Sequence, residues 1–388
     1  MVPTIQALRS YLPPLLLVTL FVPSVFSWSR LVQPFRMATG SPSYKRAKLD
    51  PTPSTKVIGT HSGTFQADEA MGVWMLRQLP AYRNSKVVRS RNPDDLKGLD
   101  IVIDVGGVYD HAVKRYDHHQ RGYEERFDDG RDGTNGRCTV LSASGLVYRH
   151  YGKEVIKQFY PQIDDTDLDI AYTKVYDSLL EALDAIDTGV EMVPEGATAL
   201  YKDSTGLSRR VGRLNPRWNE VDEDGKGPVP DERFEQAAQL CGEDFLATLT
   251  SVVESDIPAR ALVESALLSR SDVHASGEII KLESGGLPWR SHLYELEKVH
   301  NVSPLIKYVL YTDQAGMWRI QAVTIEGKGF QNRLSMPEPW RGVRDEDLSK
   351  VTGIEGCIFC HANGFIGGNK SYEGVLKMAK ACLEQPHD

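Results

Sequence analysis

The chain has 388 residues, which suggests two domains of ordinary size and some additional tail. Apolar residues make up 41% and charged residues 25%, which excludes wholesale disorder and allows a sizeable buried core. No uninterrupted apolar run reaches the ~20 residues of a membrane helix, so we expect no membrane span. Five cysteines are too few for a disulfide scaffold and favour a reduced compartment.

The charge is unevenly distributed along the chain. The formal net charge is −8, from 45 basic and 53 acidic side chains. The first 49 residues hold six of the basic residues and no acidic one, so the remainder is strongly acidic. Such a chain cannot attract nucleic acid through a general basic field. A phosphate-bearing substrate would require bound metal ions or a few well-placed Arg and Lys side chains.

Residues 1–55 are rich in Pro, Ser and Thr and are predicted to be a targeting or disordered segment. The short apolar stretch 11–27 follows Arg9 and fits a secretory signal, while the absence of acidic residues fits an organellar presequence nearly as well. Met37 could be a second start, and residues 45–50 form a basic cluster of the nuclear-import type. We therefore expect mitochondrion, nucleus or both, with a secretory-route organelle such as a plastid as the alternative.

The predicted elements after this segment alternate between strand and helix. Strands are expected at 55–58, 86–89 and 100–105, and helices at 67–79, 142–151 and 167–186. The near-continuous apolar run at 100–105 is typical of a strand buried in a parallel sheet. Residues 124–137 are acidic and Gly-rich and predict a mobile loop. This order indicates a doubly wound α/β domain over residues 56–190.

The last helix of this group has an apolar face, and its spacing predicts that the face is buried. Its members are Tyr172, Val175, Tyr176, Leu179, Leu183 and Ile186.

The remaining chain predicts a connecting region and a second domain. Residues 191–268 are expected to hold an irregular linker and then a long helix, 232–268, interrupted near Pro258. Strands are expected at 279–282, 306–311, 318–323 and 357–361, with a Gly-rich turn and a terminal helix at 371–383. Residues 269–388 would form a smaller C-terminal α/β domain that binds substrate.

Acidic and imidazole residues follow several of the predicted elements. They are His61 and Asp68 after the first strand, Asp104 after the third, the Asp117-His118-His119 run, and Asp187 near a helix end. Ligands in doubly wound sheets bind at the carboxyl ends of strands. Considered alone, Asp104 could be a capping residue for the next element, and Asp187 could lie on a solvent-exposed helix face. The whole set of acidic and imidazole residues, in this order, predicts metal-assisted hydrolysis.

Seven segments are similar to the melanocyte-proliferating-gene (Myg) exonuclease family, which is related to the DHH phosphoesterases. The resemblance covers residues 56–383. The segments are IGTHSGTFQADEA, IVIDVGG, RYDHHQRG, LDAIDTG, LSRRVGRLNPRWNE, NRLSMPEPWRG and HANGFIGGNKSYEG.

The resemblance implies a two-domain DHH-phosphoesterase-like fold with a two-metal centre, usually Mn²⁺ or Mg²⁺, in the parallel-sheet domain. It places His61 and Asp104 on one metal, and Asp68, Asp104, His118 and Asp187 on the other, with Asp104 as the bridge. His119 would contact substrate or donate a proton, and Asp117 would orient the imidazoles.

One residue departs from the family pattern. The family usually has His where this chain has Gln66. An amide oxygen is a weak, hard ligand, which Mn²⁺ or Mg²⁺ tolerates better than Zn²⁺ does. Gln66 therefore predicts a weaker first metal site, a shifted metal preference or lost activity.

The resemblance also implies a phosphate-binding group in the second domain. Its expected members are Gly367 and Gly368 before the terminal helix, with His361, Arg341 and, more weakly, Arg333 as side-chain partners. An ordinary Gly-containing turn is the alternative. Cys357 and Cys360 match a haem-attachment pattern, but they lie in an apolar strand-like run and are expected to be buried. Among the aromatic residues, Trp340 is the candidate for an exposed stacking surface.

The resemblance thus implies a metal-dependent 3′–5′ RNA exonuclease that hydrolyses phosphodiesters with water activated by two metal ions. Its substrate would be single-stranded RNA or a short oligonucleotide. A small-phosphoester phosphatase or pyrophosphatase of the DHH type is one alternative. A catalytically impaired RNA-binding regulator, motivated by Gln66, is another. The sequence leaves the oligomeric state open.

Overall fold

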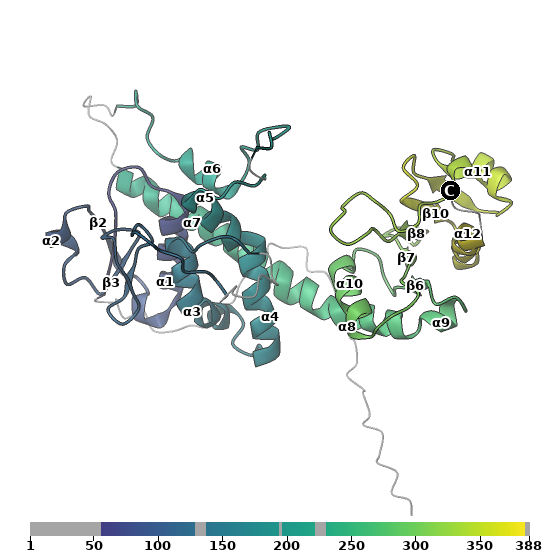
Figure 1. Cartoon of the computed structure of the whole chain (residues 1–388), viewed down its shortest axis with the longest axis horizontal. Helices are drawn as coiled ribbons and strands as arrows, with labels where there is room; N and C mark the ends of the chain where they lie inside the picture. The colour runs from purple at the N-terminus through teal and green to yellow at the C-terminus, as the bar shows by residue number, and fades with distance from the viewer. Residues whose placement is uncertain (1–55, 129–136, 194–195, 222–229, 385–388) are drawn as a thin grey trace, which may run out of the picture. The chain divides into compact units, whose positions relative to one another are not determined.

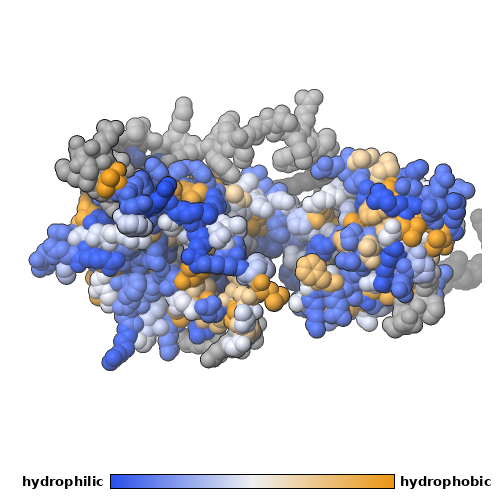
Figure 2. All heavy atoms as spheres, turned by 90° about the horizontal axis from the view of Figure 1, so that it is seen from above, coloured by the Kyte–Doolittle hydropathy of each residue, from blue (hydrophilic) through white to orange (hydrophobic). Residues whose placement is uncertain are grey.

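The computed structural model describes residues 56–128, 137–193, 196–221 and 230–384 (Figure 1). The predicted targeting segment, and residues 129–136 of the predicted mobile loop, lie outside these ranges. The described helices include none that is long and apolar enough to span a bilayer. On the face drawn in Figure 2, hydrophilic residues cover most of the described surface and apolar residues form small scattered groups.

The first sheet has five strands in the order β2-β1-β3-β5-β4. Their bounds are Val57–Thr60 (β1), Lys86–Arg89 (β2), Ile101–Ile103 (β3), Tyr109–Asp110 (β4) and Arg115–Tyr116 (β5). The pairs β1–β2, β1–β3 and β3–β5 are parallel, and β4 runs antiparallel to β5. The prediction of a parallel sheet is confirmed for four strands, while β4 adds an antiparallel edge. The carboxyl ends of β2, β1, β3 and β5 therefore lie at the same edge.

Helices pack with this sheet around one apolar core. They are α1 (Ala67–Gln78), η1 (Pro80–Tyr82), α3 (Ala143–Phe159), α4 (Asp165–Val175), α5 (Glu181–Thr188), α6 (Leu207–Gly212) and α7 (Pro230–Thr250). The short helix α2 (Pro93–Leu96) follows β2, and its buried Leu96 is not part of this core. The core continues through α6 and α7, with Phe234 and Phe245 both fully buried. Gly242 of α7 lies so close to α1 that a Cβ there would be 2.0 Å from Trp74 Nε1. Part of the predicted connecting region thus belongs to the first core.

Two predicted helices contain π-helical turns. The expected helix 167–186 is divided into α4, η2 (Tyr176–Leu180) and α5, and the expected helix 232–268 into α7, η3 (Ser251–Asp256) and α8 (Ile257–Leu268). Pro258 lies in the first turn of α8, directly after the π turn η3. Ile186 is 61% exposed, so the prediction that it lies on the buried face is wrong. The extra residue in a π turn rotates the following helix face away from the simple 3.6-residue pattern.

The second sheet has the order β6-β7-β8-β10-β9 and is mixed. The strands are β6 (Ile279–Lys281), β7 (Tyr308–Thr312), β8 (Trp318–Ala322), β9 (Cys357–Cys360) and β10 (Ile366–Asn369). Only β6–β7 among these pairs is parallel. The accompanying helices are α9 (Arg270–Val273), α10 (Arg290–Val299), η4 (Glu338–Trp340), α11 (Asp345–Thr352) and α12 (Tyr372–Glu384). The chain is therefore α/β with two sheets, and the DHH-like division into domains stays a prediction.

Two expectations for this part of the chain are wrong, and one is confirmed. The Gly-rich turn is strand β10, whose backbone pairs with both β8 and β9. Trp340 is only 3% exposed and packs in the apolar core, so it offers no stacking surface. Cys357 and Cys360 are buried as expected.

Candidate metal centre

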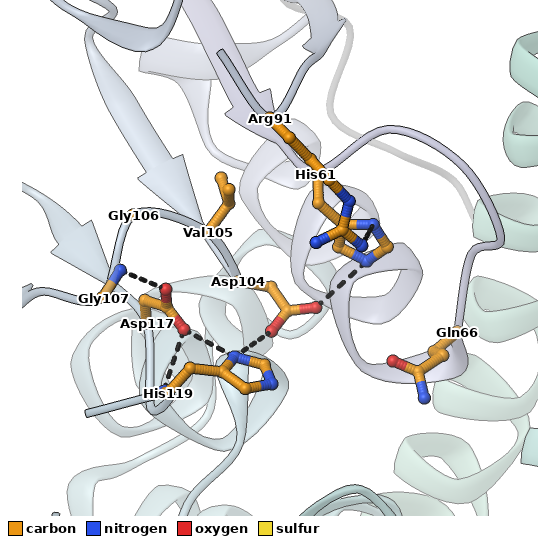
Figure 3. A pocket seen from close by; sticks show the side chains of 9 residues that line it. All are labelled: His61, Gln66, Arg91, Asp104, Val105, Gly106, Gly107, Asp117 and His119. Carbon is orange, nitrogen blue, oxygen red and sulfur yellow. Dashed lines mark hydrogen bonds and ion pairs between the residues drawn. The ribbon is translucent and has the colours of Figure 1, made fainter. Parts of the chain in front are cut away.

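The candidate site lies at the carboxyl edge of the first sheet. Arg91 follows β2, His61 follows β1, Asp104 follows β3, and the Asp117-His118-His119 run follows β5. Four strands that are distant in sequence thus deliver polar side chains to one edge, which is where ligands bind in open α/β sheets. Figure 3 shows Asp104 between His61 on one side and His119 on the other.

The backbone of Asp104 has a left-handed conformation with φ of 54°. Its N–H still donates to Tyr116 O at 2.9 Å, so the residue stays joined to β5 while the chain turns. Asp and Asn tolerate this conformation better than other non-glycine residues. The turn places a buried carboxylate where ligand atoms from the neighbouring elements meet.

Four side chains form the main cluster, and their ligand atoms lie within 4.8 Å of one another. They are Asp68, Asp104, His118 and Asp187. His118 Nε2 is 3.1 Å from Asp187 Oδ2, and His118 Nδ1 is 3.8 Å from Asp104 Oδ1. The structure therefore brings together the four residues that the family resemblance assigns to one metal ion. We call this set the four-residue cluster.

The electrostatics of the four-residue cluster fit a divalent cation. Both carboxylate oxygens of Asp68, and Oδ1 of Asp104, are buried and accept no hydrogen bond within the described ranges. Burial, together with the neighbouring carboxylates, raises the pKa of Asp68 well above its usual value. Burial also raises the pKa of Asp104. A cation would relieve this repulsion, and carboxylate and imidazole groups are both ligands of divalent metal ions.

A second cluster shares Asp104 and contains a residue that the sequence analysis missed. His61, Glu69 and Asp104 bring ligand atoms within 4.8 Å of one another, with His61 Nε2 3.1 Å from Glu69 Oε1 and 3.3 Å from Asp104 Oδ2. Burial opposes the charge on His61, but Asp104 and Glu69 raise its pKa to about 10. Asp104 thus lies at the junction of two clusters, as a bridging residue must.

Gln66 precedes α1 and is exposed. Its backbone N–H donates to both carboxylate oxygens of Glu69, at 2.9 and 3.0 Å, which caps the helix. The Gln66 amide lines the same hollow as His61 and Asp104, but Figure 3 draws no interaction between it and the other eight residues. Glu69, in the first turn of the same helix, supplies the carboxylate that lies beside His61.

Asp117 orients His119. One carboxylate oxygen accepts the His119 backbone N–H at 3.0 Å and lies 2.8 Å from His119 Nδ1. The other oxygen accepts the Gly107 N–H at 2.5 Å. Burial opposes ionisation of Asp117, but these two N–H donors lower its pKa. With Nδ1 held by Asp117, His119 keeps Nε2 for the solvent-facing side, since the imidazole is 62% exposed.

Arg91 is the second residue that the sequence analysis missed. Its Nε donates to Ser62 O at 3.1 Å, and one terminal nitrogen lies 3.2 Å from His61 Nδ1. Arg91 is the only Arg or Lys among the described residues that line a hollow of about 350 Å³ together with His61, Asp104 and His119. We call this the first hollow. A cation at its edge is suited to a phosphate group.

A buried carboxylate, Asp184, lies one helical turn before Asp187 and joins α5 to α3. Asp184 Oδ1 accepts from Ser142 N at 3.1 Å, Ser142 Oγ at 2.8 Å and Gly145 N at 3.1 Å, and Oδ2 accepts from Tyr176 OH at 2.9 Å. Asp184, a residue of α5, therefore accepts hydrogen bonds from the N-terminus of α3 and caps that helix.

The five predicted substrate-binding residues lie in the second sheet and its loops. Arg333 donates to both oxygens of buried Glu297 at 2.7 Å, so its guanidinium is already paired. Arg341 Nε donates to Met336 O at 2.8 Å, and Arg341 and His361 are exposed near the turn before β10.

Gly367 and Gly368 are packed inside strand β10. A Cβ at Gly368 would lie 2.6 Å from the mobile end of the Arg319 side chain and 3.2 Å from the Trp318 carbonyl oxygen, so space is tight here. The phosphate-binding role of the two glycines stays a prediction.

Comparison with known proteins identifies relatives along most of the chain. The MYG1_exonuc family model, described as uncharacterised protein family UPF0160, matches residues 57–383. "MYG1 exonuclease" of Rattus norvegicus is 48% identical over 329 residues, covering 84% of each chain. "MYG1 exonuclease" of Homo sapiens is 44% identical over 376 residues, covering 97% of each. "MYG1 protein" of Dictyostelium discoideum is 44% identical over 86% of this chain and 98% of its own.

Proposed function

Because the chain belongs to the MYG1 exonuclease family, we propose that it is a metal-dependent exonuclease that shortens RNA from the 3′ end. The names of its relatives support nuclease activity. The observation that supports metal dependence is the four-residue cluster, in which both buried carboxylate oxygens of Asp68 accept no hydrogen bond within the described ranges. The acidic net charge is compatible with an RNA substrate, since bound cations would supply local positive potential.

Two residue groups would hold divalent ions, Mn²⁺ or Mg²⁺. Asp68, His118 and Asp187 would hold one, His61 and Glu69 the other, and Asp104 would contact both. Ions in such a site lower the pKa of water and offset charge on the phosphoryl group.

In the hydrolysis that we propose, a water oxygen bonds to phosphorus and the bond from phosphorus to the 3′-oxygen of the preceding nucleotide breaks. The leaving oxygen needs a proton, and His119 Nε2 is the group that this chain offers, because Asp117 holds Nδ1. The products are a nucleoside 5′-monophosphate and an RNA one residue shorter.

Product analysis on 5′-labelled single-stranded RNA with Mn²⁺ tests the proposal. A ladder that shortens from the 3′ end supports it. Release of orthophosphate without nucleotides would instead identify a DHH-type phosphatase. Binding without turnover, with turnover restored by Gln66→His, would identify a catalytically impaired RNA-binding protein.

We expect Arg91→Gln to raise KM for RNA about tenfold and to change kcat by less than about threefold. A hydrogen bond to a charged group contributes about 1.5–3 kcal/mol, and about 1.4 kcal/mol corresponds to tenfold in binding. Steady-state kinetics over a range of RNA concentrations would measure this. Arg260→Gln is the control and should leave KM unchanged, because it removes an arginine of α8 that pairs with Glu295 of α10. An unaltered KM in Arg91→Gln would exclude Arg91 as a phosphate contact.

We expect Gln66→His to tighten Mn²⁺ binding at the weaker site about tenfold, because an imidazole nitrogen is a better ligand than an amide oxygen for this ion. Calorimetric titration of the substrate-free protein would measure it. Gln66→Ala is the matched variant, since the bonds from the Gln66 backbone N–H to the Glu69 carboxylate survive both substitutions. Equal affinity in all three proteins would show that Glu69 completes the site without residue 66.

A further inference from the structure

Ile186 is an exposed apolar residue beside a proposed metal ligand. It lies in α5 directly before Asp187 and is 61% exposed, although neighbouring Leu183 is only 3% exposed. An isolated exposed isoleucine is ordinary, but this one lines a hollow. We call it the second hollow.

The second hollow has a volume of about 280 Å³, near the lower end of the ~300–1,000 Å³ typical of small-ligand sites. Leu183, Ile186 and Phe65 supply apolar wall, and Ser208 and Arg209 of α6 supply polar groups. Its shape is fixed by Asn215, which bonds to both backbone polar groups of Phe65, at 2.9 Å from the N–H and 2.8 Å from the carbonyl.

The two hollows adjoin the same metal-binding side chains but differ in chemistry. Asp104 lines the first hollow, Asp68 and Asp187 line the second, and Gln66 lines both. Side chains of the four-residue cluster thus line both hollows. The first hollow is lined mainly by charged and polar groups, while the second has an apolar wall. A nucleotide has the same division into an anionic phosphate and an apolar base face.

We propose that the second hollow binds the nucleoside at the 3′ end of the substrate. The base lies against Ile186 and Leu183, and Ser208 and Arg209 hydrogen-bond the ribose hydroxyls or the base edge. The phosphate of that nucleotide then reaches the four-residue cluster, and the preceding phosphate lies toward Arg91. This assignment rests on the proposed function and restricts it to substrates that carry a nucleoside next to the phosphate.

Binding of adenosine 5′-monophosphate and of ribose 5-phosphate to the Mn²⁺-loaded protein tests the assignment, because ribose 5-phosphate carries a hydroxyl group in place of the base. Burial of a base against apolar side chains predicts about tenfold tighter binding of the adenosine monophosphate. Ile186→Ser should remove most of this preference and leave the affinity for ribose 5-phosphate unchanged. Val113→Ser is the matched control, since Val113 is 56% exposed and does not line the second hollow.

Equal affinities for the two ligands in the unaltered protein would overturn the assignment. So would a preference that persists in Ile186→Ser, or a loss of affinity for both ligands in that variant. The 5′-labelled RNA assay on the same samples reports separately on the proposed function. Base-selective binding without RNA shortening would contradict the exonuclease proposal alone.

Discussion

Asp104→Asn is expected to reduce RNA hydrolysis by at least about a thousandfold. Asp104 belongs to both metal-binding clusters, so its carboxylate supports both ions at once. Charge stabilisation by metal ions contributes several kcal/mol, and each ~1.4 kcal/mol is a factor of ten in rate. Single-turnover kinetics with saturating Mn²⁺ would measure the loss. A rate near that of the unaltered protein would contradict the bridging role.

The same substitution should leave the metal-free fold intact. Asn tolerates the left-handed backbone of this position, and the N–H bond to Tyr116 O does not involve the side chain. Removing one of several buried carboxylates also relieves repulsion with Asp68 and Glu69. We expect the Tm of the metal-free variant to equal or exceed that of the unaltered protein. If the Tm of the variant fell by many degrees, the loss of activity would be due to a destabilised fold and not to the loss of a metal ligand.

Asp184→Ala is expected to lower the free energy of unfolding of the first core by about 2–4 kcal/mol. The substitution leaves buried donors of Ser142, Gly145 and Tyr176 without an acceptor, and each such loss costs about 1–3 kcal/mol before relaxation. The cavity lies at the N-terminus of α3, where water has limited access. Urea denaturation followed by far-UV circular dichroism would measure the change.

An exposed acidic residue gives the comparison for this variant. Asp169→Ala removes a carboxylate that pairs with Lys153 at 2.5 Å but is 65% exposed, so it should cost less than about 1 kcal/mol. Equal effects of the two substitutions would show that Asp184 is not a cap. Because Asp187 lies one turn after Asp184, Asp184→Ala should also weaken Mn²⁺ binding.

The sequence predicts the parts of the site that depend on local pattern. The apolar run at 100–105 identifies strand β3, and therefore the strand end at which Asp104 lies. Gly189, with φ of 78°, caps α5 two residues after Asp187, so the expected helix end near Asp187 is confirmed. These features follow from neighbouring residues, so one sequence is enough to find them.

Other parts depend on tertiary packing and are not visible in one sequence. Glu69 occupies a helix-capping position. The neighbouring sequence explains Glu69 by this role alone and does not indicate that it also lies beside His61. Arg91 becomes a site residue only because β1 and β2 are parallel neighbours. The π turn η2 changes which side of α5 is buried, which leaves Ile186 exposed. Strands β4 and β5, two residues each, are too short for any alternation to appear.

The most direct test of the account is the location of manganese in crystals of the Mn²⁺-loaded protein, measured by anomalous scattering. We predict two manganese peaks at the carboxyl edge of the first sheet, both in contact with Asp104. His61 and Glu69 would flank one peak, and Asp68, His118 and Asp187 the other. A single peak, or manganese bound away from Asp104, would contradict the two-ion centre.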